Sequence, residues 1–124
     1  NDVTIVSTGH LVWQSIIAAN ELSHEGIKAD VINIHTIKPL DKQIILDSIR
    51  KTNCIVSCEE HNIIGGLGES VSRLIVKNIL CPMEFVGVND TFGESGKPED
   101  LMKKYKLDSE NIIKKCKKVI SRKK

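Results

Sequence analysis

The chain alternates short runs of β-branched and aliphatic residues with longer stretches in which apolar residues recur every three or four positions. The runs are Val3–Ser7, Ala29–Ile34, Cys54–Cys58 and Met83–Val88. Strands that alternate with helices in this way are typical of βαβ units and a parallel sheet. The pattern therefore predicts an α/β fold in three layers, α/β/α, around a mainly parallel sheet of four strands.

The stretches between and after these runs carry the apolar faces of helices. The first two helices have Val12, Trp13, Ile16, Ile17, Ala19 and Leu22, and then Ile44, Ile45, Leu46 and Ile49. Two later helices have Leu67, Val71, Leu74 and Ile75, and then Ile112, Ile113, Cys116, Val119 and Ile120. A further short helix, opened by Pro98, is predicted through Leu101, Met102 and Tyr105.

Residues typical of helix ends support these boundaries. Gly26 is placed to stop the first helix, while Asp41 and Asp108 are placed to cap the second and the last. Right-handed crossovers put successive helices on the faces of the sheet. We predict the strand order 2-1-3-4, which puts helices on both faces and one switch point between the first and third strands.

The carboxyl edge of the sheet at this switch point is where open α/β folds bind ligands. There the turn Thr8-Gly9-His10 would meet the turn Glu59–Gly68, which leads from a buried strand through glycines into a helix. One hypothesis is a proton-transfer cluster of His10 with Glu59, Glu60 and His61. Adjacent residues of an extended chain point opposite ways, however. We therefore favour the interpretation that these groups hold loops and satisfy the helix N-terminus.

A binding role for the same edge is the alternative. Gly65, Gly66 and Gly68 precede a helix N-terminus, which attracts anions, but their spacing is not the G-x-G-x-x-G of dinucleotide sites. Nearby glutamates also oppose an anion. We take six residues as candidate interdomain or anion-contact positions: His10, Glu60, His61, Gly65, Gly66 and Gly68. The four histidines lack metal-site spacing, so we assign no metal-binding residue. We also assign no catalytic or cofactor-binding residue.

Size and composition narrow the possibilities further. With 124 residues the chain is a single domain spanning residues 1–124. Only 3% of the residues are aromatic, so stacking platforms for nucleic acid are nearly absent, and no apolar stretch is long enough for a membrane span. The net charge of +2 hides seven basic residues after Glu110, which leave 11 basic against 16 acidic residues before them. We interpret this basic tail as the solvated face of a terminal helix.

The four cysteines are Cys54, Cys58, Cys81 and Cys116. They lack the pairing typical of structural zinc sites and of disulfide frameworks. Cys54 and Cys58 lie on one face of a predicted strand, so we expect small buried hydrophobes rather than redox groups. Free cysteines of this kind favour a reducing, cytoplasmic location.

Three segments add a family resemblance: Thr36–Asp41, Glu59–Glu69 and Val86–Gly96. In their order and spacing, from about Asp2 to Val119, they resemble the C-terminal domain of transketolase, most of all the type split into two polypeptides. The first two segments are shared with 1-deoxyxylulose-5-phosphate synthase and 2-oxo-acid dehydrogenase decarboxylase subunits, which stay as alternatives. The third favours transketolase, because the synthases typically have Gly-x-Pro-Asp where this chain has Gly87-Val88-Asn89-Asp90.

The resemblance implies a parent enzyme of the pentose phosphate pathway that transfers a two-carbon ketol unit between sugar phosphates. It also implies that thiamine diphosphate and a divalent metal, Mg²⁺, are bound by other domains and not by this one. The family's C-terminal domain is structural and supports the dimer. Implied partners are the preceding transketolase domains or an N-terminal subunit, in a homodimer or heterotetramer, and neither nucleic acid nor membrane.

The beginning of the chain is consistent with a piece of a larger assembly. Its first residue is Asn1 rather than Met, and we expect a domain excised from, or belonging to, a longer protein. The family fold has one further strand, antiparallel, before the first strand predicted here. Without it, one edge of the sheet lacks its usual cover.

Overall fold

A computed structural model describes residues 1–35, 40–62, 66–88 and 108–123, with the side chains of 60–62 and Val88 excepted. Its elements are β1 (Val3–Ser7), α1 (Leu11–His24), β2 (Ala29–Asn33), α2 (Lys42–Thr52), β3 (Ile55–Asn62), α3 (Leu67–Asn78), β4 (Met83–Val88) and α5 (Ser109–Ser121). The short helix predicted after Pro98 lies outside the described residues.

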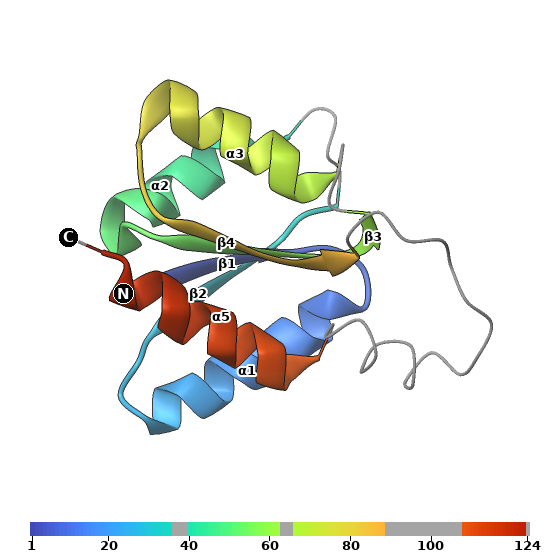
Figure 1. The fold of residues 1–124 in the computed structure, drawn as a ribbon, viewed down its shortest axis with the longest axis vertical. Helices are drawn as coiled ribbons and strands as arrows, with labels where there is room; N and C mark the ends of the chain where they lie inside the picture. Colours follow the sequence, from blue (N-terminus) through green and yellow to red (C-terminus); the bar gives the residue numbers. More distant parts are fainter. Residues whose placement is uncertain (36–39, 63–65, 89–107, 124) are drawn as a thin grey trace.

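The four strands form one parallel sheet in the order β2-β1-β3-β4. Helices α1 and α5 cover one face of the sheet, and α2 and α3 cover the other (Figure 1). The predicted three-layer α/β/α fold and its strand order are therefore confirmed.

Each face of the sheet is buried in its own apolar cluster. Ile5 and Val56 pack with α1 and α5, whereas Val6 and Ile55 pack with α2 and α3. Successive residues of a strand point to opposite faces, so a sheet covered on both sides needs continuous apolar strands. This requirement explains why the strands read as unbroken hydrophobic runs in the sequence.

The predicted apolar face of α1 is wrong in part. The helix buries Leu11, Ser15, Ala18 and Leu22, while Trp13 and Ile16 are 65% and 45% exposed. The buried positions are spaced by four, three and four residues, which is one stripe of a helix. Apolar residues outside this stripe stay in solvent, however hydrophobic they are. Ile44 of α2 is likewise 49% exposed, beside its buried neighbours Ile45 and Leu46.

Strand β3 is longer than predicted. It continues through Glu59, Glu60 and His61, where we expected a turn, and ends at Asn62. The extension is held by β4, because Asn62 pairs with Val88 after an irregularity in the register that follows Cys58. Strand β2 ends one residue earlier than predicted, at Asn33.

The predicted helix ends are confirmed. Asp41 Oδ1 accepts a hydrogen bond from the Ile44 amide at 3.5 Å, and Asp108 Oδ1 accepts one from the Asn111 amide at 3.1 Å. Gly26 follows α1 with a φ of +81°. In this left-handed conformation the amides of Gly26 and Ile27 reach back to carbonyls of the last turn.

The basic tail is only partly a solvated face. Lys117 is exposed and pairs with Glu25 at 2.7 Å. Lys123, by contrast, donates hydrogen bonds to the carbonyl oxygens of Asp2 at 2.8 Å and Thr52 at 2.9 Å. The prediction is wrong for this residue, which ties the end of the chain to its beginning and to the end of α2.

Hydroxyl groups connect α2 to the sheet beneath it. Thr4 Oγ1, fully buried on β1, lies 2.7 Å from both Ser48 Oγ and Thr52 Oγ1 of α2. Ser48 donates onward to Asp30 of β2, and Thr52 donates to the Cys54 carbonyl. Buried polar groups are costly unless they are bonded, so this network fixes the position of α2 over β1 and β2.

We expect Thr4→Val to lower the free energy of unfolding by about 1–2 kcal/mol, because it keeps the side-chain shape but removes the buried hydroxyl that donates to Ser48 or Thr52. Urea denaturation of Thr4→Val, Ser48→Ala and the double variant measures this loss. The two substitutions should be non-additive, since they share one hydrogen bond. Strictly additive effects would contradict the network.

Candidate functional site

The carboxyl edge brings together the two turns that the sequence predicted to meet. Ser7 at the end of β1 pairs with Cys58 of β3, and the Thr8 amide donates to the Cys58 carbonyl at 3.1 Å. Gly9 then turns the chain with a φ of +59°, and exposed His10 precedes α1. The switch point between β1 and β3 is thus at the predicted place.

Glu59 is the central residue of this edge. Its side chain is 2% exposed and faces the start of α3. Oε1 accepts a hydrogen bond from the Leu67 amide at 3.0 Å, and Oε2 accepts one from the Gly68 amide at 2.7 Å. The N-cap residue, Gly66, has no side chain to do this. Glu59, on the neighbouring strand, therefore accepts hydrogen bonds from two N-terminal amides of the helix. Its negative charge is stabilised by the positive end of the helix dipole.

This arrangement determines what the edge can do chemically. A carboxylate that bonds two amides inside the protein is not placed to exchange protons with a substrate. An external anion at the N-terminus of α3 would have to displace this buried carboxylate from Leu67 and Gly68. The contacts of Glu59 are those of the structural interpretation, in which the acidic residues satisfy the helix N-terminus.

The remaining candidate positions lie around Glu59. Gly66 and Gly68 begin α3, and His10 lies before α1 at the same edge. Glu60 and His61 belong to β3, but their side chains lie outside the described residues, as does Gly65. The proposed contacts of these six positions with another domain or an anion stay predictions.

Gly68 permits close packing of α3 on the sheet. A Cβ atom at this position would lie 2.7 Å from Phe85 Cδ1 and 3.1 Å from Ser57 Oγ. Such distances are too short for carbon contacts at normal packing density. The glycine is thus needed for contact between α3 and the strands β3 and β4, and this role is independent of any ligand.

The thiol groups are poor nucleophiles. Cys54, Cys58 and Cys116 are fully buried and unpaired, as predicted for Cys54 and Cys58, and Cys81 is half-buried. Burial raises the pKa of Cys58 to about 12 and that of Cys81 to about 11, and it also raises the pKa values of Cys54 and Cys116. Because the thiolate is the reactive form, these cysteines are inert at neutral pH.

The described residues offer neither a group of metal ligands nor a membrane-spanning helix. No three or more His, Cys, Asp or Glu side chains in these ranges are grouped so that they could hold a metal ion. None of the helices that the structure describes is long and apolar enough to cross a membrane.

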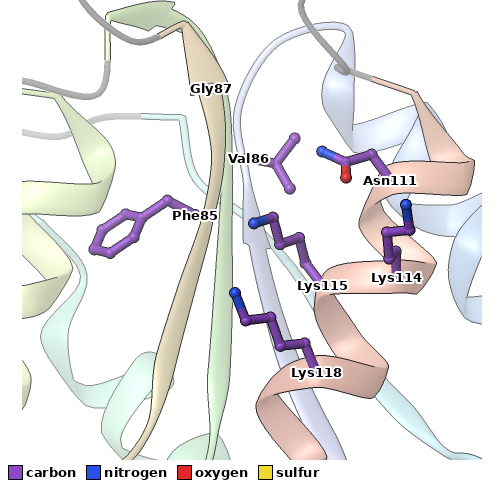
Figure 2. Close-up of a pocket in the computed structure, with 7 residues that line it drawn as sticks. All are labelled: Phe85, Val86, Gly87, Asn111, Lys114, Lys115 and Lys118. Atoms are coloured by element: carbon purple, nitrogen blue, oxygen red, sulfur yellow. The ribbon is translucent and has the colours of Figure 1, made fainter.

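A hollow of about 330 Å³ lies between β4 and α5, on the opposite side of the sheet from α3. Its lining residues are Phe85, Val86, Gly87, Asn111, Lys114, Lys115 and Lys118. Lys115 and Lys118 extend from α5 toward β4, while the Phe85 ring points away from them (Figure 2). The interpretation of the basic tail as a solvated face misses this hollow. The sequence does indicate it, because positions 111, 114, 115 and 118 are spaced so that they lie on one side of a helix.

A family model and two relatives similar in sequence all point to the same family. A family model described as "Transketolase, C-terminal domain" matches residues 1–112. The 6-deoxy-6-sulfo-D-fructose transketolase subunit SqwH of Clostridium sp. (strain MSTE9) is 40% identical over 98% of this chain and 38% of its own length. A putative transketolase C-terminal section of Methanocaldococcus jannaschii is 42% identical over 91% of this chain and 35% of its own.

One further match is in structure and another is in sequence. A solved structure titled "Split gene transketolase, inactive beta4 tetramer" superposes with a TM-score of 0.94 at 38% identity, covering 99% of this chain and 40% of that one. The 1-deoxy-D-xylulose-5-phosphate synthase of Heliobacterium modesticaldum is 36% identical over 90% of this chain and 18% of its own length. The chain thus spans well under half the length of the relatives that it matches.

We expect Glu59→Gln to lower the free energy of unfolding by about 2 kcal/mol, because the amide cannot accept both backbone hydrogen bonds and the charge is lost. Urea denaturation measures the loss, and hydrogen exchange of the Leu67 and Gly68 amides should accelerate. Glu110→Gln, in the exposed first turn of α5, is the matched control and should cost less than about 1 kcal/mol. Equal losses for the two variants would contradict the capping role.

We expect Gly68→Ala to destabilise the fold by about 1–2 kcal/mol through overpacking, although alanine is the better helix former. Phe85→Ala removes the ring atoms nearest to the new Cβ. In that background, Gly68→Ala should become neutral or stabilising in the same urea measurement. The same loss in both backgrounds would show that contact with Phe85 is not the reason for the glycine.

Proposed function

The chain belongs to the transketolase C-terminal domain family, and on this premise we propose that it is the noncatalytic, dimer-supporting domain of a transketolase. The parent enzyme would transfer a two-carbon ketol unit between sugar phosphates, as a step of the pentose phosphate pathway. The similarity to a transketolase subunit and to a split-gene transketolase supports this proposal.

The observation that carries the noncatalytic role is the internal use of Glu59. Its buried carboxylate is bonded to the amides of Leu67 and Gly68 at the edge where a ligand would be expected. The buried carboxylate of that edge thus stabilises the fold. Nearby, the Cys58 thiol is buried with its pKa raised to about 12, so it does not supply a nucleophile in its place.

We place thiamine diphosphate and Mg²⁺ on other parts of the parent enzyme. The described part of this chain does not fit either group. It has no cluster of metal-ligating side chains, and the amides of Leu67 and Gly68, which could bind a diphosphate, are already bonded to Glu59.

The partners we propose are the preceding transketolase domains or an N-terminal subunit, joined in a homodimer or heterotetramer. Exposed large apolar side chains support such contacts, since they gain by being covered. They include Trp13 and Ile16 on α1, Val76 on α3, which is 71% exposed, and Leu80 just after α3, which is 81% exposed. His10, exposed at the carboxyl edge, is a further candidate contact. A cytoplasmic location agrees with the free thiols.

The specific alternative is a synthase of the 1-deoxy-D-xylulose-5-phosphate type, favoured by the 36% identity to one such enzyme. A 2-oxo-acid dehydrogenase decarboxylase subunit is a more remote alternative from the shared sequence segments. These enzymes differ from a transketolase in substrate, because the alternatives take a 2-oxo acid where a transketolase takes a ketose phosphate.

The test is to isolate the native assembly through an affinity tag on this chain. With thiamine diphosphate, Mg²⁺ and pentose phosphates, the assembly should catalyse ketol transfer, while the 124-residue chain alone should neither turn over nor bind thiamine diphosphate in calorimetry. Release of CO₂ from pyruvate instead of ketol transfer would support the alternative. Turnover by the chain alone would refute the noncatalytic role.

A further inference from the structure

The proposed function leaves unused a concentration of positive charge along the groove between β4 and α5. Lys114, Lys115 and Lys118 line the hollow, and Arg122 lies one turn beyond Lys118 on the same helix. Glu84 of β4, with 13% of its side chain exposed, is paired with Lys115, Lys118 and Arg122. Among the described residues this leaves a surplus of two positive charges on the cluster, and Lys114 on the lining of the hollow adds a third.

The contacts of Glu84 show how two of these lysines are held. Arg122 Nη1 lies 2.6 Å from Oε2 and also donates to the Met83 carbonyl at 2.9 Å. Lys115 Nζ and Lys118 Nζ each lie 3.7 Å from Oε1, which is too long for a hydrogen bond. Glu84 therefore draws the two ammonium groups together without using their N–H donors.

This geometry fits the oxygens of one anionic group. Since both Nζ atoms lie 3.7 Å from the same oxygen, they are at most 7.4 Å apart. Charge-assisted hydrogen bonds of about 2.8 Å to two oxygens of a single phosphate can bridge such a gap. Glu84 already lies between them, but its single negative charge is shared with Arg122 as well, so the net positive charge of the cluster attracts a second anion to the exposed side of the ammonium groups.

The hollow also restricts the kind of ligand. Its volume of about 330 Å³ is at the lower end for small-molecule sites. A dianion matches the surplus charge better than a single carboxylate does. The Phe85 ring points away from the lysines (Figure 2), so the described residues that line the groove offer no aromatic platform on which a nucleobase could stack.

We propose that the groove between β4 and α5 binds the phosphate group of a small molecule through Lys115 and Lys118. Glu84 and Arg122 act as positioning residues, which hold the lysines in place. The site is separate from the switch point between β1 and β3, and it does not depend on whether the parent enzyme transfers ketol units.

A competing explanation is that the lysines guard β4, which is an edge strand of the sheet. Charged side chains at such an edge prevent pairing with another chain. On that explanation, removal of the lysines would cause self-association, and phosphate would have no specific effect on the protein.

The test is calorimetric titration of the 124-residue chain with inorganic phosphate and with glycerol phosphate, at constant ionic strength set by chloride. Saturable binding is expected for both ligands. Lys115→Ala/Lys118→Ala should weaken it at least about tenfold, the effect of losing charge-assisted hydrogen bonds. Lys117→Ala, the same change on the same helix but at the residue paired with Glu25, should stay within about twofold of the unmodified chain.

Two further measurements complete the test. Circular dichroism establishes that the variants are folded, and Lys115→Arg/Lys118→Arg, which retains both charges, should keep most of the affinity. Sedimentation with phosphatidylcholine vesicles containing phosphatidylglycerol tests a lipid headgroup as the source of the phosphate. The proposal is overturned by the absence of saturable binding, by equal binding of the double alanine variant, or by binding to vesicles alone.

Discussion

The hydrogen bonds of the Glu59 carboxylate to the start of α3 constrain the whole functional edge of this domain. They join a strand to the helix that follows it, with the charge buried where the helix dipole stabilises it. Because α3 is held there, its first turn packs so closely on the sheet that only glycine fits at position 68, against Phe85. The edge that usually binds ligands in such folds is thus used to assemble the domain.

Helix α5 complements this arrangement from the other face of the sheet. Its apolar stripe, with Ile112, Cys116 and Val119, closes one core cluster. Lys123, just after the helix, bonds the carbonyls of Asp2 and Thr52 and so joins both ends of the chain. The lysines on the flank of α5 take no part in that closure. Lys115 and Lys118 share the single charge of Glu84 with Arg122, and the remaining positive charge at the β4 groove calls for a separate explanation.

The fold was predictable because its signals are local. β-branched runs indicate strands, Asp41 and Asp108 are good helix caps, and a covered parallel sheet fixes the order of the layers. The errors concern tertiary geometry. Nothing local distinguishes the exposed Trp13 from an apolar residue of the buried stripe of α1, and the end of β3 depends on its partner β4. That acidic residues of this segment satisfy the helix N-terminus was predicted, but not that Glu59 is the residue that does so, since this requires knowing that a strand residue reaches the amides of a helix eight and nine positions later.

The two core clusters of the described residues are buried inside this domain, so its contribution to a larger enzyme has to pass through its surface. That surface has two kinds of feature. Exposed apolar side chains such as Trp13 and Leu80 gain free energy when a partner covers them, whereas the lysines of the β4 groove, whose charge Glu84 balances only in part, gain when a second anion binds beside them. The groove lies beside an edge strand of the same sheet that carries Glu59. An anion bound there would contact α5 and β4 directly, and through β4 it would be coupled to β3 and to the start of α3.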